Sequence, residues 1–119
     1  MARAILDESK IHPAIQDRVA NYHRDVVTAV QTAVAANKVV IVGMRQNPYP
    51  RKAKRLLDAK AVAYTYLEYG SYLGDWRRRS ALKAWSGWPT LPMVFVNGTL
   101  IGGASDLKAL IDSGEFDRL

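Results

Sequence analysis

Residues 46–52, QNPYPRK, follow the apolar run VVIVG and precede the basic segment AKRLLD. A turn that leads from an apolar strand into a basic helix is a frequent place for chemistry. This turn offers the amide of Asn47, the hydroxyl of Tyr49 and the charges of Arg51 and Lys52. An amide and a hydroxyl form hydrogen bonds, but neither is a reactive group like a thiolate. We therefore expect hydrogen bonding and charge at this turn, without a nucleophile.

A second polar corner is predicted at Gly102–Asp106. Two adjacent glycines let the backbone approach a ligand closely. A helix that begins at Ala104 or Ser105 would add free amide groups and a positive dipole end, which together attract an anion. The same residues could instead serve the fold alone, as could WPTLP at residues 88–92.

The chain contains no cysteine, which excludes disulfides, thiolate nucleophiles and Cys-ligated zinc or iron–sulfur sites within it. Its two histidines, His12 and His23, have no third ligand at a metal-like spacing. We expect both to be surface residues, and we predict no metal site.

The net charge of +6 is concentrated in two basic clusters, at residues 51–55 and 77–83. Such a balance favours anionic partners: a carboxylate or phosphate ligand, an acidic protein face or nucleic acid. Basic residues interleaved with aromatic ones can also bind single-stranded nucleic acid, but such residues more often form core and rim, so nucleic acid is not the expected partner. Each cluster taken alone is also typical of a solvated helix face.

The 119 residues, 49% of them hydrophobic, suit one domain at residues 13–119 after a flexible arm at residues 1–12. Apolar residues at steps of three and four from Ile15 to Ala33 predict one amphipathic helix from Pro13 to about Asn37, which would provide a left-handed cap. The β-branched run at 39–42 predicts a strand buried on both faces, as in a central parallel strand. A second helix is expected at about 49–60, with Asn47 as its N-cap.

The remaining elements are a strand at 62–68, a loop, a helix that Asp75 caps, a hairpin and a last helix. The hairpin is the clearest local signal, because Asn97 and Gly98 both accept the positive φ of a type I′ turn. The predicted order is α-β-α-β-α-β-β-α, an α/β fold with a four-stranded mixed sheet flanked by helices.

Two segments resemble glutaredoxins, which have a thioredoxin-like fold. VVIVGMRQNPYPRKAKRLL is similar to the first strand, active-site turn and helix of that family, whose usual turn is CPYC. WPTLPMVFVNGTLIGG is similar to the second half of monothiol glutaredoxins, in which WPT-x-P, a strand, a turn and IGG recur. The likeness spans about residues 24–112. It implies a glutaredoxin-like fold with NPYP at the CPYC position.

The resemblance places Asn47 at the nucleophilic cysteine of the family and Pro50 at the second cysteine of dithiol members. Neither residue can carry out thiol–disulfide exchange, which needs an attacking thiolate. The bridging iron–sulfur cluster of monothiol members is lost with the same cysteine. We therefore expect no catalytic residue of the family's kind, with Tyr49 as the one candidate for a different chemistry.

The resemblance also implies a glutathione groove. Pro92 aligns with the family's cis-proline, which would leave the backbone of Leu91 free to pair with an extended peptide, and the 102–106 corner would hold the γ-glutamyl carboxylate. A lysine that meets the glycyl carboxylate in many relatives is replaced by Met44. Trp88 is expected beside the groove. The predicted ligand-binding residues are Arg45, Asn47, Tyr49, Arg51, Thr90, Leu91, Pro92, Gly103, Ala104, Ser105 and Asp106.

The function expected from these features is non-covalent binding of glutathione, a peptide or a protein partner in cell redox homeostasis, without thiol–disulfide exchange. One alternative is an enzyme that uses the thiol of bound glutathione, with Tyr49 as its hydrogen-bond donor. Another is an adaptor for an acidic protein through the Arg77–Arg79 helix. No secretory signal and no membrane-spanning run is recognised, so a cytoplasmic setting is expected.

Overall fold

A central four-stranded sheet organises the fold, in a computed structural model that describes residues 2–119. The strand order is β2-β1-β3-β4, with β1 at Val39–Gly43, β2 at Thr65–Glu68, β3 at Met93–Val96 and β4 at Thr99–Gly102. Strand β1 pairs parallel with β2 and antiparallel with β3, and all of its residues are buried. The prediction of a mixed sheet with a buried central strand is confirmed.

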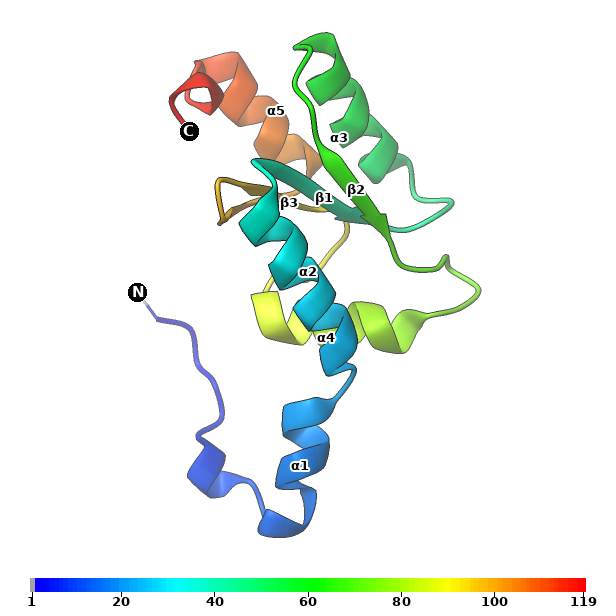
Figure 1. Ribbon diagram of the computed structural model, residues 1–119, viewed down its shortest axis with the longest axis vertical. Coiled ribbons are helices and arrows are strands. Elements are labelled where there is room, and N and C mark those ends of the chain that lie inside the picture. Colours follow the sequence, from blue (N-terminus) through cyan, green and yellow to red (C-terminus); the bar gives the residue numbers. More distant parts are fainter. Residues whose placement is uncertain (1) are drawn as a thin grey trace.

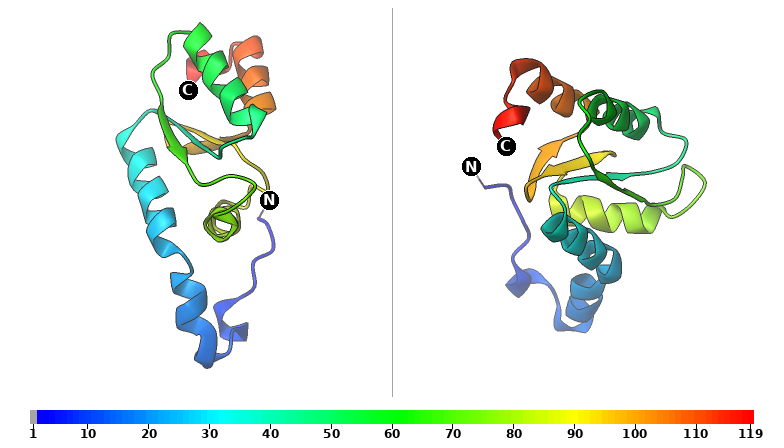
Figure 2. Two further views of the ribbon diagram at one scale, coloured as in Figure 1. Left: turned by 90° about the vertical axis from the view of Figure 1, so that its right-hand side faces the viewer. Right: turned by 45° about the horizontal axis from the view of Figure 1, so that its top comes forward.

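Helices cover both faces of the sheet (Figure 1). Their bounds are α1 Pro13–Asn21, α2 Arg24–Ala36, α3 Pro48–Ala59, α4 Trp76–Ser86 and α5 Ala104–Ser113, with short 3-10 helices at Glu8–Lys10 and Phe116–Arg118. Helices α2 and α4 pack together on one face, and α3 and α5 on the other (Figure 2). This is the thioredoxin-like architecture that the sequence predicted.

The alternation of side chains along the strands divides the core between the two faces. Val40 and Val42 of β1 belong to the α2–α4 side, whereas Val39 and Ile41 belong to the α3–α5 side. Leu82 completes the first cluster and has no exposed surface. Strands β3 and β4 meet at Asn97 (φ 49°) and Gly98 (φ 81°), so the predicted hairpin turn is also confirmed.

The first predicted helix is wrong in one respect, because residues 13–37 form two helices rather than one. His23 takes the left-handed conformation (φ 44°, ψ 41°) between α1 and α2. One residue outside the helical region redirects the axis. The apolar spacing conceals this break because Ile15, Val19, Tyr22 and Val26 keep helical steps across it.

Three smaller expectations also need correction. Asn37 ends α2 in an extended conformation, and both its backbone N–H and its Nδ2 donate to the Ala33 carbonyl, at 3.0 and 2.9 Å. Asp75 precedes α4 with φ 66° and makes no side-chain cap, because its carboxylate lies 3.5 Å from Arg78 Nε. Strand β2 begins at Thr65 rather than at residue 62.

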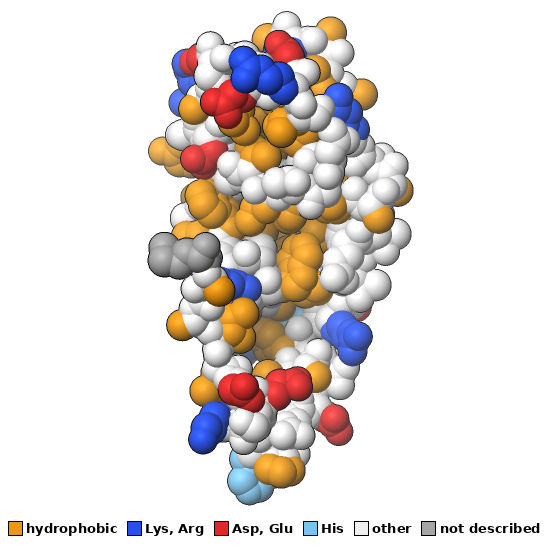
Figure 3. All heavy atoms as spheres, turned by 90° about the vertical axis from the view of Figure 1, so that its left-hand side faces the viewer, with side chains coloured by type: hydrophobic (Ala, Val, Ile, Leu, Met, Phe, Trp, Pro, Cys, Tyr) orange, Lys and Arg blue, Asp and Glu red, His pale blue; other side chains and the backbone are white. Residues whose placement is uncertain are grey.

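The N-terminal segment extends from one end of the molecule and folds back beside the helices (Figure 1). Arg3 donates through Nη2 to the Trp85 carbonyl at 3.3 Å, while Ile5 and Leu6 are exposed. Figure 3 shows the molecule from the side on which the N-terminal segment lies. The surface is hollowed there between this segment and the body of the protein. The flexible arm at residues 1–12 stays a prediction. Within residues 2–119, no helix has both the length and the apolar character needed to cross a bilayer.

Candidate functional site

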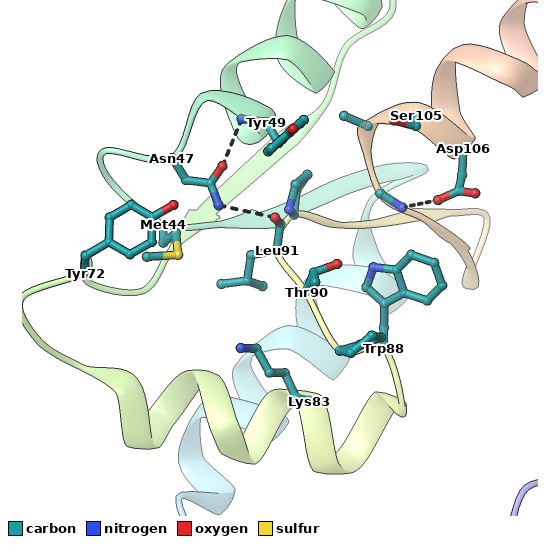
Figure 4. A pocket seen from close by; sticks show the side chains of 14 residues that line it. Met44, Asn47, Tyr49, Tyr72, Lys83, Trp88, Thr90, Leu91, Ser105 and Asp106 are labelled. Carbon is teal, nitrogen blue, oxygen red and sulfur yellow. Dashed lines mark hydrogen bonds between the residues drawn. The ribbon is translucent and has the colours of Figure 1, made fainter.

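A groove of about 460 Å³ lies where the first residues of α3 and α5 meet the segment before β3 (Figure 4). Its floor includes Met44 and Leu91, which also belong to the hydrophobic core. The groove is lined by Met44, Asn47, Tyr49, Tyr72, Lys83, Trp88, Pro89, Thr90, Leu91, Pro92, Gly103, Ala104, Ser105 and Asp106. Nine of the eleven predicted ligand-binding residues are among these.

Asn47 joins two sides of the groove through its side-chain amide. Its backbone is extended (φ −95°, ψ 124°) and its Oδ1 accepts a hydrogen bond from the Tyr49 N–H at 2.9 Å. Its Nδ2 donates to the Leu91 carbonyl at a longer 3.4 Å. Pro48 takes the first helical position, where no backbone donor is needed. The amide thus caps α3 and also contacts the opposite wall.

Leu91 presents a backbone edge to the groove. The Leu91–Pro92 peptide bond is cis, the form that the resemblance implies. The Leu91 carbonyl is in contact with Asn47, so it is less free than expected. The Leu91 N–H makes no hydrogen bond to another group in residues 2–119, so this donor is the part of the edge that a ligand could use.

The start of α5 forms the opposite end of the groove. Asp106 Oδ2 accepts from the Gly103 N–H at 2.9 Å, so this carboxylate caps its own helix. The first helical hydrogen bond runs from the Leu107 N–H to the Gly103 carbonyl, at 3.0 Å. The amides of Ala104, Ser105 and Asp106 precede that bond and carry the positive end of the helix dipole. The corner is therefore suited to an anion, with a carboxylate beside it for a cation.

Lys83 brings the groove a positive charge that the sequence analysis did not assign to it. It projects from α4 toward the segment before β3 (Figure 4), and it makes no ion pair within residues 2–119. Its place in a basic helix was visible in the sequence, but its direction depends on how α4 packs. Tyr72, exposed at 66%, was likewise missed because it lies in a loop.

Trp88 lies in the groove, as the sequence analysis expected. Its indole Nε1 is buried and has no hydrogen-bond partner in the described chain. A β-carbon built on Gly103 would lie 3.9 Å from this nitrogen, so the two groups are close neighbours. Buried donors are nearly always paired, which makes this indole an exception at the edge of the groove.

Two of the predicted ligand-binding residues, and Pro50 at the position that the resemblance assigns to a second cysteine, lie outside the groove lining. Arg45 and Arg51 line a second cavity beside the NPYP turn. Pro50 is fully buried and would collide with any side chain at position 43, since its Cβ lies 2.9 Å from a β-carbon built on Gly43. It therefore packs against β1 instead of facing the groove.

The chemistry available in the groove is hydrogen bonding and charge. The Tyr49 hydroxyl is the phenol at the start of α3, and the residue is 53% exposed. Residues 2–119 contain no cluster of three or more histidine, aspartate or glutamate side chains arranged to hold a metal ion. The contacts thus favour a small zwitterionic or peptide-like ligand.

Comparisons with known proteins agree with this geometry. The family model described as Glutaredoxin matches residues 39–101. A "Glutaredoxin-like protein" of Dictyostelium discoideum is 43% identical over 106 residues, covering 88% of this chain and 86% of its own length. The "Probable monothiol glutaredoxin 2" of Rickettsia typhi is 30% identical over 95 residues, covering 76% and 83%.

Solved structures are similar over about four fifths of the chain. Oxidized glutaredoxin 2 from Chlamydomonas reinhardtii superimposes with a TM-score of 0.69 at 30% identity, over 80% of this chain and 90% of that one. A buckwheat glutaredoxin–glutathione complex gives 0.69 at 25% identity, over 79% and 86%. The residues that the family model matches include the NPYP turn and residues 88–92 of the groove, whereas the start of α5 lies beyond them.

Proposed function

Because this chain belongs to the glutaredoxin family, we propose that its groove binds glutathione, or a peptide that resembles it, without covalent chemistry. The observation that carries the proposal is the meeting of three features in one groove: the unpaired N–H of Leu91, the amides that begin α5 and the free charge of Lys83. A glutathione complex of a similar buckwheat protein supports the choice of ligand.

The charges of the groove match those of glutathione. Its γ-glutamyl end carries a carboxylate and an ammonium, which correspond to the α5 amides and the Asp106 carboxylate. Its central cysteine has a backbone carbonyl that can accept from the Leu91 N–H. Its glycyl carboxylate then needs a cation. Many relatives have a lysine for it at the position of Met44, and in this chain Lys83 supplies the charge.

The proposed binding does not lead to thiol–disulfide exchange by the protein. Exchange begins with a thiolate that attacks a disulfide sulfur, and the chain has no cysteine. Asn47 lies where the family has its nucleophile, and both ends of its amide are engaged in hydrogen bonds. Binding in a context of redox homeostasis is the function that we propose for the groove.

Calorimetric titration tests this proposal with two ligands, glutathione and S-methylglutathione. If binding is non-covalent and does not need the thiol, the two dissociation constants should agree to within about threefold. The absence of heat with either ligand over the accessible concentration range would overturn the proposal.

An enzyme that uses the thiol of bound glutathione is the second candidate, favoured by the Tyr49 hydroxyl in the groove at the start of α3. A positive helix end lowers the pKa of a nearby thiol and a hydroxyl can donate to the thiolate. Turnover of a model electrophile that disappears in Tyr49→Phe would establish this function. Equal rates with the unmodified protein and in a reaction without protein would exclude it.

A further inference from the structure

A second cavity, of about 200 Å³, lies beside the NPYP turn. It shares Met44 and Asn47 with the groove, so the two spaces have a common wall. Its other lining residues come from the turn, α3 and β2, and are Arg45, Gln46, Pro50, Arg51, Lys54, Tyr66 and Glu68. We call it the turn cavity.

The turn cavity has an excess of positive charge. Arg45, Arg51 and Lys54 face a single carboxylate, that of Glu68. Arg45 Nε lies 3.8 Å from Glu68 Oε2, which is a long ion pair between exposed side chains. Arg51 and Lys54 make no ion pair within residues 2–119. Two cations are therefore left without a counter-charge around a concave surface.

Tyr66 holds part of this arrangement in place. The Lys54 ammonium lies 4.0 Å from the centre of the Tyr66 ring, in a cation–π contact. The Tyr66 hydroxyl donates to Glu68 Oε1 at 3.2 Å. Burial, together with the charge of Glu68, raises the pKa of Tyr66 to about 12. The phenol thus stays neutral and adds no negative charge to the cavity.

We propose that the turn cavity binds the carboxylate of an acidic side chain on a partner polypeptide, through Arg51 and Lys54. The two unpaired cations attract an anionic group, and the backbone donor of Leu91 in the adjoining groove favours an anion carried on a polypeptide. The common wall with the groove lets one extended segment reach both spaces, since the Leu91 N–H can pair with its backbone. This site goes beyond glutathione binding and does not depend on it.

The test is an amide NMR titration with acetyl-Gly-Glu-Glu-Gly-amide, with its glutamine analogue as the neutral control. We expect saturable shifts between Met44 and Lys54 that shrink as salt is raised. The double variant Arg51→Gln/Lys54→Gln should weaken binding about tenfold. The matched variant Lys52→Gln/Arg55→Gln removes the same charge from α3 outside the cavity and should stay within about twofold of the unmodified protein.

Three results would overturn the inference: equal shifts with the glutamine peptide, equal weakening in the two double variants, or inorganic phosphate binding there more tightly than the acidic peptide. Glutathione should shift amides at Gly103–Asp106, a corner that the acidic peptide in the turn cavity leaves unchanged. A failure of the turn cavity is therefore distinguishable from a failure of the groove.

Discussion

At the scale of single residues, the amide of Asn47 lies at the position that the resemblance assigns to the family's reactive sulfur. Asn47 Oδ1 accepts from the start of α3, and Nδ2 donates to the Leu91 carbonyl across the groove. Asparagine is among the best N-cap residues, so the turn can keep its shape without the sulfur. Asn47 thus supplies no thiolate and connects the two walls of the groove.

The charge of Lys83 is the single-residue feature whose role is most open to measurement. Lys83→Gln should weaken glutathione binding about fivefold, a loss of about 1 kcal/mol, because a partly exposed ion pair with the glycyl carboxylate disappears. Calorimetric titration gives the affinity directly. Arg77→Gln, on the same helix outside the groove, is the matched control and should leave the affinity unchanged. Equal losses in both variants would mean that overall charge, and not a contact, attracts the ligand.

Arg79 shows why a sequence cluster is not a surface patch. The Arg77–Arg79 run looked like one basic face for an acidic partner. Arg79 is only 7% exposed and donates through Nη1 to the carbonyls of Tyr69 and Gly74, at 3.1 and 2.7 Å. It therefore ties the loop before α4 to the core. Arg77 stacks on Trp76, at 4.6 Å from its ring centre.

At the scale of elements, backbone conformation marks where the sequence pattern fails. The break between α1 and α2 depends on one left-handed residue, His23, and hydrophobic spacing carries no information on a single dihedral angle. Elements with a specific turn chemistry were predictable: Asn47 before α3, and Asn97 with Gly98 in the hairpin. The N-cap predicted at Asp75 was wrong, because its carboxylate has an alternative partner in Arg78.

His23→Gly tests the left-handed junction between α1 and α2. A residue with a β-carbon at positive φ costs about 1 kcal/mol, and glycine avoids that cost. We expect His23→Gly to unfold with a free energy about 1 kcal/mol higher than His23→Ala, measured by urea denaturation. Since both variants remove the imidazole, their difference isolates the backbone. A more stable alanine variant would show that α1 and α2 can join as one helix.

Gly102 at the end of β4 is the second backbone test. Its φ of 112° is unfavourable for other residues, and an added β-carbon would collide with the Asp106 carboxylate that caps α5. Gly102→Ala should lower the free energy of unfolding by about 2 kcal/mol. Gly114→Ala, at φ 81° with no neighbour within 4 Å of the added carbon, should cost about 1 kcal/mol. Equal costs would mean that the cap relaxes without loss.

At the scale of the whole molecule, the fold could be predicted from sequence more completely than the site. The buried run at 39–42 and the hairpin define the sheet because strand patterns and turn residues are local signals. The groove is formed by elements that are far apart in the chain. Its backbone residues, such as Leu91 and Gly103, could therefore be predicted only from the resemblance to the family. Lys83, Tyr72 and the division between groove and turn cavity depend on how α4 and α3 pack, which no local pattern encodes.

Stability at high pH reports on three partly buried tyrosines near β2. Burial is the main reason why the pKa values of Tyr64, Tyr66 and Tyr69 lie above the ordinary value of 10.0. The pKa of Tyr66 is raised to about 12. The folded state therefore binds these protons more tightly than the unfolded state. Their contribution is fully present below pH 10 and is lost as the pH rises through the folded pKa values.

We therefore expect the free energy of unfolding to fall between pH 10 and about 12, as measured by urea denaturation at each pH. Tyr66→Phe should reduce the steepness of that fall. Tyr72→Phe, with a phenyl ring that stays exposed, is the matched control and should keep the original slope. The same slope in all three proteins would contradict a raised pKa at Tyr66.

The central claim is that a glutaredoxin groove without a thiol still holds its ligand, and amide NMR during a glutathione titration tests it most directly. The account predicts saturable shifts at Asn47, Tyr49, Lys83, Leu91 and the Gly103–Asp106 corner. A spectrum that does not change at these residues, at concentrations where the ligand itself remains intact, would contradict it.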